Sequence, residues 1–165
     1  FGFSLPPWAY WSPEDFVART DISAEVIRAR AREHNRPIAL VGWSLGGYIA
    51  REIARDNPDV VSAVVTLGTP IIGGPKYTLA AGRYQRRGYD LDWLERVTVR
   101  RHDRPIACPV SVIYSKVDAI IGWPAAYDRF TPQARHFEVN CAHTAFGYHP
   151  RVFEIIASEL ELNLG

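Results

Sequence analysis

The chain has 165 residues, of which 47% are apolar and 22% are charged, and its formal net charge at pH 7 is +1. This length allows one domain with a hydrophobic core. The interspersed, nearly balanced charges favour neither nucleic acid nor an anionic membrane as a partner. No apolar run approaches the ~20 residues that a membrane-spanning helix needs.

The sequence contains no methionine and begins with "FGFSLPPWAYW", which resembles neither a signal peptide nor a transit peptide. We therefore expect an upstream part to have been removed by processing or truncation. The aromatic residues Trp8, Tyr10 and Trp11 are expected to cover apolar surface rather than to line a substrate site. The sequence does not fix a compartment, although a cytoplasmic location is slightly favoured.

The first half of the chain predicts a helix, a strand and a second helix. Residues 22–34 repeat apolar side chains on one helical face, and the residue before Pro37 is disfavoured in a helix. Residues 38–43, "IALVGW", form a continuous apolar run that is typical of a strand buried on both faces of a parallel sheet. Residues 45–57 carry the apolar stripe of a helix that stops at Pro58.

The remainder predicts more strands and a closing helix. Apolar runs that are typical of strands occur at residues 60–70, 109–118 and 134–140. Residues 71–107 are rich in glycine and arginine and are expected to hold short helices around 76–87 and 90–98. Residues 150–164 form an amphipathic helix pattern. This order predicts an α/β fold with a mostly parallel sheet flanked by helices, in a single domain of residues 1–165.

One motif in this order points to chemistry. Residues 42–46, "GWSLG", match G-x-S-x-G and lie between the predicted strand and helix, where a sharp turn exposes the serine. Ser44 is therefore interpreted as a nucleophile rather than as a small turn residue. The N–H group of Leu45, at the start of the helix, is a candidate donor to a developing oxyanion.

A serine nucleophile needs a base, and the base needs an orienting acid. Asp118 directly follows the strand predicted at 109–118 and is preferred as the acid over four other aspartates, namely Asp90, Asp92, Asp103 and Asp128. His143 follows the last predicted strand and is preferred as the base over His149, six residues further on. The other histidines, His34, His102 and His136, are interpreted as structural.

Several ordered segments resemble the α/β-hydrolase superfamily, specifically its bacterial lipase-like and esterase-like members: "LVGWSLGGYIAREIARDNPDVV", "VVTLGTP", "VSVIYSKVDAIIGWPAA" and "CAHTAFGYHPRVFEIIASEL". The resemblance covers roughly residues 37–160. It implies hydrolysis of small-molecule or lipid esters through an acyl-enzyme, with Ser44 as nucleophile, His143 as general base and acid, and Asp118 as the orienting carboxylate. It implies no cofactor and no metal. Trp43 and Trp123 are the expected walls of the substrate pocket, and residues 71–107 a lid-like insertion.

The sequence departs from this superfamily at its start. Nothing before residue 37 contains the His-Gly loop that supplies a second oxyanion donor, and the strands that normally precede the serine are missing. We expect strand 38–43 to become a sheet edge, covered by a second copy of the chain, by an N-terminal fragment or by the opening segment. The alternative to an esterase is therefore a catalytically weak or silent hydrolase-fold fragment that serves as a binding or assembly module.

The two cysteines are expected to be free thiols. Cys108 precedes one predicted parallel strand and Cys141 follows another, so they belong at opposite ends of the sheet. A strand of this length separates them by about 15–20 Å. A disulfide needs Cα atoms within ~7 Å.

Overall fold

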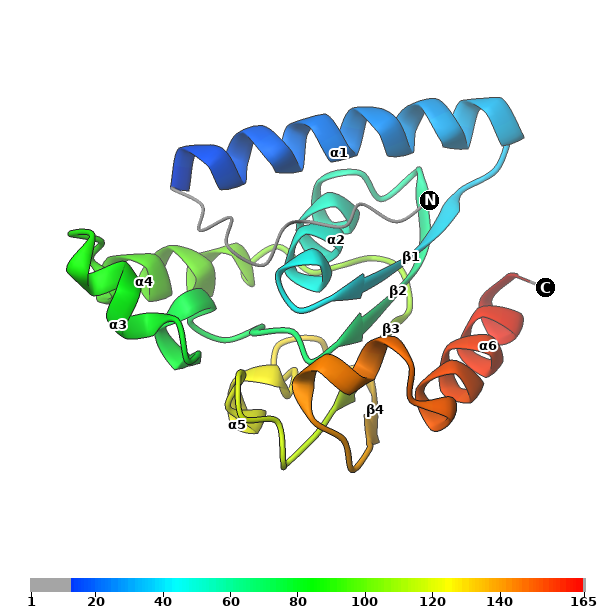
Figure 1. Ribbon diagram of the computed structural model, residues 1–165. Coiled ribbons are helices and arrows are strands. Elements are labelled where there is room, and N and C mark those ends of the chain that lie inside the picture. The colour runs from blue at the N-terminus through cyan, green and yellow to red at the C-terminus, as the bar shows by residue number, and fades with distance from the viewer. Residues whose placement is uncertain (1–12, 165) are drawn as a thin grey trace.

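A four-stranded parallel sheet forms the centre of the molecule (Figure 1). The computed structural model describes the backbone of residues 13–164 and the side chains of residues 20–162, so the expectations for Trp8, Tyr10 and Trp11 lie outside the described residues. The strands follow one another in chain order across the sheet: β1 (Ile38–Trp43), β2 (Val61–Leu67), β3 (Val110–Tyr114) and β4 (Arg135–Glu138). The predicted α/β fold with parallel strands is therefore confirmed.

Helices cover both faces of this sheet. Helices α1 (Pro13–His34) and α2 (Leu45–Asp56) pack on one face, and α6 (Pro150–Leu164) packs on the other (Figure 1). Successive side chains of β2 point to opposite faces of the sheet: Val64 belongs to the hydrophobic cluster under α2, and Val65 belongs to the cluster under α6. Both side chains are almost fully buried. Burial on both faces explains why the two central strands, β2 and β3, are apolar runs, whereas β1, which was expected to be buried on both faces, is largely half-buried or exposed at the edge of the described sheet.

The connection from β2 to β3 extends over the side of the sheet. It contains η1 (Gly74–Tyr77), α3 (Ala81–Arg86) and α4 (Leu91–Arg101). The helix expected at 76–87 is broken, because Thr78 pairs with Ile121 in an antiparallel bridge and the N–H of Leu79 donates to the carbonyl of Ile120. These contacts fasten the connection to the loop that follows β3.

Two short elements complete the chain order. Helix α5 (Trp123–Ala126) follows β3, and η2 (His143–Gly147) follows β4. Neither was anticipated from the sequence, since four or five residues are too few to show a helical period. Both lie beyond the carboxyl ends of strands, on the side where the candidate site is built.

The two edges of the sheet differ. Strand β1 is outermost on one side among the described strands, as expected, and the side chains of Val41 and Trp43 are 45% and 42% exposed. Strand β4 is outermost on the other side, is only four residues long, and carries Arg135 and Glu138 at its ends. Among the helices of residues 13–164, none is long and apolar enough to cross a membrane.

Candidate active site

Ser44 occupies the turn between β1 and α2. Its backbone angles, φ 55° and ψ −125°, lie in a region that non-glycine residues rarely adopt. Its N–H donates to the carbonyl of Leu67 on β2 over 2.8 Å, and its own carbonyl accepts from the N–H of Gly47 over 3.1 Å. The strand-to-helix turn that the sequence motif predicts is therefore present around this serine.

Glycines make this turn possible. A Cβ at Gly42 would lie 2.4 Å from the Cα of Gly47, and a Cβ at Gly47 would lie 2.0 Å from the hydroxyl of Thr69 and 2.7 Å from the carbonyl of Gly42. By contrast, a Cβ at Gly46 would meet nothing within 4 Å. Close backbone packing thus needs glycine at 42 and 47, and the motif glycine at 46 faces open space.

Asp118 and His143 are brought together at the carboxyl ends of β3 and β4. The Nδ1 of His143 lies 2.7 Å from Oδ2 of Asp118, and both side chains are largely buried. The other carboxylate oxygen, Oδ1, accepts the N–H groups of Ile120 and Ile121 over 2.8 and 2.9 Å. One oxygen therefore anchors the carboxylate in its loop, and the other orients the imidazole.

Hydrogen bonds keep this carboxylate ionised despite its burial. Burial by itself raises the pKa of Asp118, but the hydrogen bond from His143 and those from Ile121 and Ile120 outweigh it and hold the pKa below its usual range. An ionised carboxylate at Asp118 can only accept, so it takes a hydrogen bond from Nδ1–H of His143, and the other ring nitrogen, Nε2, is then the one that can accept a proton.

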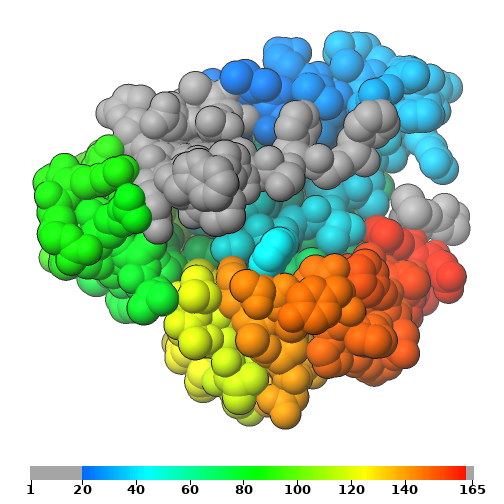
Figure 2. Space-filling view, viewed as in Figure 1, coloured from blue at the N-terminus to red at the C-terminus, as the bar shows by residue number. Residues whose placement is uncertain are grey.

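Aromatic rings link His143 to the serine turn. The rings of Trp43 and His143 have their centres 5.6 Å apart, and Phe146 meets the imidazole edge-on at 6.1 Å. Trp43 directly precedes Ser44, so the imidazole lies beside the turn that carries the serine. In Figure 2, the cyan surface around residue 44 lies beside the orange surface of the segment around residue 143.

The remaining predicted site residues lie at the same side of the sheet. Leu45 is the first residue of α2, where N–H groups have no partner within the helix. Trp123 begins α5, is 38% exposed, and has its ring 6.3 Å from that of Tyr114. The ammonium of Lys116 lies 5.8 Å from the Trp123 ring centre.

The competing histidines have other neighbours. His149 lies just before α6, where its N–H donates to the carbonyl of Ala145. His136 lies within β4, stacks on Tyr127 at 4.0 Å, and bonds through Nε2 to the carbonyl of Asp128. Neither has Asp118 as a hydrogen-bond partner, whereas His143 does.

The competing aspartates are also engaged elsewhere. Asp128 is buried and pairs with the guanidinium of Arg51 over 2.7 Å. Asp90 caps α4 by accepting the N–H of Trp93, and Asp92 pairs with Lys76.

Sequence reasoning missed the contribution of Ser115. Its hydroxyl accepts the N–H of Val117 over 3.2 Å and that of Cys141 over 3.3 Å, and the side chain is buried. It thereby joins the loop of Asp118 to the loop that leads to His143. A serine directly after a strand is a recognisable turn former, but its second, long-range bond leaves no local signal.

Both cysteines are free, as predicted, and both are buried. Cys108 belongs to the cluster under α2, and Cys141 belongs to the cluster under α6. Burial raises the pKa of both thiols, and the charge of Asp118 raises that of Cys141 further. Thiols in such surroundings remain protonated and are poor nucleophiles. Within the described part of the chain, no group of three or more histidine, cysteine, aspartate or glutamate residues could hold a metal ion.

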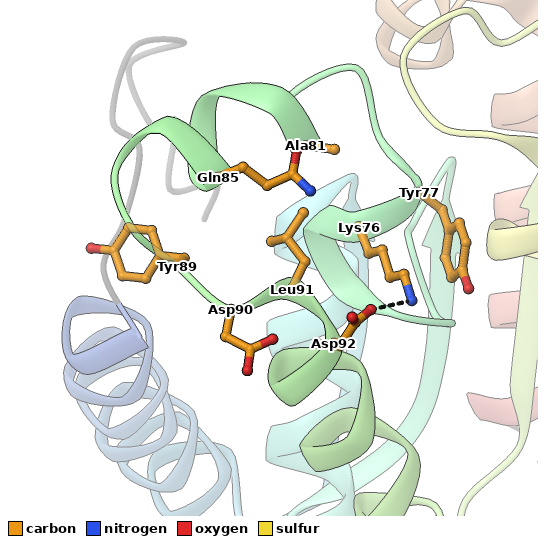
Figure 3. A pocket seen from close by; sticks show the side chains of 8 residues that line it. All are labelled: Lys76, Tyr77, Ala81, Gln85, Tyr89, Asp90, Leu91 and Asp92. Carbon is orange, nitrogen blue, oxygen red and sulfur yellow. Dashed lines mark ion pairs between the residues drawn. The ribbon is translucent and has the colours of Figure 1, made fainter.

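A separate cavity of about 400 Å³ lies in the 71–107 segment (Figure 3). Its charged groups already have partners, since Lys76 pairs with Asp92 and Glu95, and Tyr77 donates to Glu95. None of the candidate catalytic residues lines it.

Comparison with known proteins places this chain in a family. The model of the α/β hydrolase fold family matches residues 1–99. No curated protein sequence matches significantly.

Solved structures share the fold at low sequence identity. An α/β hydrolase from the metagenome of Mar Chica lagoon sediments in Morocco is 22% identical, with a TM-score of 0.59 over 86% of this chain and 69% of that one. A lipase-esterase related protein from Clostridium acetobutylicum is 14% identical, with a TM-score of 0.64 over 96% and 79% of the two chains. The monoacylglycerol lipase of Paleococcus ferrophilus is 17% identical, with a TM-score of 0.58 over 87% and 74%. The chain belongs to the α/β hydrolase fold family.

Proposed function

We propose that this protein is a serine hydrolase that cleaves carboxylic esters through an acyl-enzyme, with Ser44, His143 and Asp118 as its catalytic triad. The observation that carries the proposal is the 2.7 Å contact between Asp118 and His143 beside the strained turn of Ser44. The nucleophile, base and acid follow three parallel strands in the order Ser, Asp, His, which is typical of this fold.

The chemistry follows from these positions. The Oγ of Ser44 attacks the ester carbonyl carbon while Nε2 of His143 takes the hydroxyl proton. The tetrahedral intermediate collapses, the bond to the alcohol oxygen breaks, and the imidazolium gives its proton to the leaving alcohol. A water molecule, deprotonated by His143, then attacks the acyl-enzyme, and the acid leaves as Ser44 regains its proton. Asp118 holds the imidazole and stabilises its charged form throughout.

The start of α2 stabilises the charge that develops on the carbonyl oxygen. The N–H of Leu45 is the proposed oxyanion donor, since the first N–H groups of a helix are unpaired and carry its positive dipole end. One such donor is worth about 10²–10³ in rate.

Aromatic side chains form the proposed substrate walls. Trp43 and Trp123 are partly exposed and flank the turn and the acid loop. Such rings favour an apolar acyl or aromatic group, which fits small-molecule or lipid esters. The similar structures include a monoacylglycerol lipase and a lipase-esterase related protein, which supports this class of substrate.

A fluorophosphonate probe tests the proposal directly, since it phosphonylates an activated serine. The wild-type chain is expected to be labelled at Ser44 and to hydrolyse p-nitrophenyl esters, whereas Ser44→Ala loses both properties. Ser158→Ala, on the exposed face of α6, is the matched control and should behave as wild type. Ester turnover that survives in Ser44→Ala would refute the assignment.

The competing proposal is a catalytically silent binding or assembly module. It draws support from the exposed side chains of Val41 and Trp43 on the outermost strand. It predicts a folded wild-type chain that the probe does not label and a second polypeptide, or a second copy, bound in native mass spectrometry. Labelling of a monomer at Ser44 would exclude it.

A further inference from the structure

The carboxyl end of β2 connects the two halves of the candidate site. The carbonyl of Leu67 accepts the N–H of Ser44 over 2.8 Å, and the N–H of Gly68 donates to the carbonyl of Ile113 on β3 over 2.9 Å. Strand β2 lies between the strand that leads to the serine and the strand that leads to Asp118. The backbone at residues 67 and 68 therefore fixes the spacing of nucleophile and acid without supplying a reacting group.

Gly68 also leaves a space that two other groups use. Its φ is +50°, and a Cβ there would lie 2.7 Å from Cε2 of Phe146 and 3.0 Å from Oδ2 of Asp118. This Oδ2 is the oxygen that bonds to Nδ1 of His143. Phe146 is the ring that meets the imidazole edge-on. Because Gly68 has no side chain, Oδ2 of Asp118 and the ring of Phe146 can both lie close to its backbone.

Neither neighbour has room to retreat. The carboxylate is anchored through Oδ1 by the N–H groups of Ile120 and Ile121, so a shift of Oδ2 would strain both bonds. Phe146 is fully buried in the cluster under α6, and packed interiors do not yield to an added methyl group without strain.

We infer that Gly68 is a positioning residue that sets the place of Asp118 Oδ2, and through it the orientation of His143. This inference rests on the proposed triad. A methyl group at this position is expected to displace the carboxylate oxygen or the Phe146 ring and so to weaken the Asp118–His143 hydrogen bond. Displacements of about 1 Å in a catalytic arrangement can cost 10²-fold in rate.

The test compares Gly68→Ala with Gly88→Ala. Gly88 also has positive φ, at +85°, but a Cβ there would meet nothing within 4 Å, so this control carries the backbone strain without the contact. The first measurement is the low-field proton resonance of the His143 Nδ1–H in NMR, which does not depend on activity. The second is the steady-state kinetics of ester hydrolysis, with the rate of fluorophosphonate labelling beside it.

In Gly68→Ala the resonance is expected to shift upfield or disappear, and kcat to fall about 10²-fold with KM changed less than about twofold. Gly88→Ala should keep the resonance and kcat. A folded Gly68→Ala with the wild-type resonance and labelling rate would overturn the inference. If the wild type itself is not labelled, the proposed function fails, while the resonance still tests Gly68.

A second variant covers the case in which Gly68→Ala does not fold. Gly68→Ala combined with Phe146→Leu removes Cε2 of Phe146, the ring atom nearest to the new methyl group, and leaves the contact with Asp118 Oδ2. This double variant is expected to fold and to lack the resonance that Phe146→Leu alone retains. If the His143 Nδ1–H resonance of the double variant equals that of Phe146→Leu alone, the positioning role of Gly68 is refuted.

Discussion

The backbone of Ser44 is held in its strained conformation by bonds at both ends of the residue. Its N–H donates to Leu67, and its carbonyl accepts from the N–H groups of Gly47 and Tyr48. Non-glycine residues with such angles cost about 1–3 kcal/mol and persist where the surroundings over-determine them. The same turn brings Gly42 and Gly47 so close that a side chain at either position would clash, which makes these glycines structural requirements.

The contrast between two adjacent glycines makes this testable. Gly47→Ala is expected to lower the free energy of unfolding by about 1–3 kcal/mol, because its Cβ would overlap the hydroxyl of Thr69 and the carbonyl of Gly42. Gly46→Ala, whose Cβ meets open space near the start of α2, should not lower it. Urea unfolding of both variants measures the difference, and equal stabilities would contradict the packing argument.

A second prediction at this scale concerns the acid. Asp118→Asn keeps the shape of the side chain but cannot stabilise a charged imidazole, and its amide favours the wrong tautomer of His143. We expect kcat to fall ~10⁴-fold with little change in unfolding midpoint. Asp103→Asn, in the turn after α4, serves as the control and should keep full turnover. Comparable activity in the two variants would remove Asp118 from the triad.

At the scale of elements, α2 carries buried charged side chains that contact later segments of the chain. Arg51 pairs with Asp128 and also donates to the hydroxyl of Thr131. Arg55 reaches the end of α4, where its guanidinium contacts Nδ1 of His102 over 3.4 Å and bonds to the carbonyl of Arg104. The helix that begins with the candidate oxyanion donor is therefore fixed to two later segments through its arginines.

His102 gives this contact a pH dependence. Burial, followed by the charges of Arg55 and Arg51, lowers its pKa to about 4, and the opposing effects of Asp128 and Glu52 are smaller. The ring also stacks on Phe130 at 3.9 Å. An unfolded histidine titrates near pH ~6.5. Between these values the unfolded chain binds a proton that the folded chain does not, so acid favours unfolding.

The free energy of unfolding is therefore expected to fall as the pH drops from 6.5 towards 4. His102→Asn removes the titrating group, while the side-chain oxygen of the asparagine can still accept from Arg55. The free energy of unfolding of this variant should therefore depend less on pH between 6.5 and 4. His34→Asn, at the exposed end of α1, is the matched control and should keep the wild-type slope. Urea unfolding at several pH values provides the measurement. If the free energy of unfolding changes with pH equally in the wild type and both variants, His102 is not the group responsible.

The sequence predicted regular elements better than irregular ones. The bounds of β1 were predicted residue for residue from its continuous apolar run, but the expected burial on both faces was wrong, because β1 is the outermost described strand and only Gly42 in it is buried. The sequence placed the start of helix α1 at residue 22, whereas the helix begins at Pro13, because its first turns lack a clear apolar period. The break at Thr78 depends on pairing with Ile121, and a contact over that distance leaves no local pattern. The pairing of Asp118 with His143 was predictable from strand order, whereas the bonds of Ser115 and the space at Gly68 required coordinates.

At the scale of the whole molecule, the two outermost strands of the sheet that residues 13–164 form differ in length and charge. Strand β4 is short and carries charges, which discourages pairing with another chain. Strand β1 is longer and exposes Val41 and Trp43. The partner expected from the sequence, a second copy or an N-terminal fragment, would bind at this edge, and that remains a prediction.

Blocking this edge should reduce self-association. Val41→Lys introduces a charge on the outermost strand, and we expect it to slow aggregation on heating because charged edges resist strand pairing. Leu162→Lys removes a similarly exposed apolar side chain from α6 and serves as the control. Light scattering during a thermal ramp compares the two, and equal protection by Leu162→Lys would attribute the effect to net charge alone.

The parallel order of the strands has a consequence for how the protein matures. Ser44 draws its backbone conformation from Leu67, and Asp118 and His143 lie 25 residues apart in sequence, so no short segment contains the whole arrangement. Contacts between distant residues form slowly, after the loops between them have closed. Reactivity of the proposed triad towards a fluorophosphonate should consequently appear only when all four strands, β1 to β4, have assembled. If the proposed triad acts, the onset of probe labelling would mark the last step of folding, and chains that are not yet folded would not react with esters.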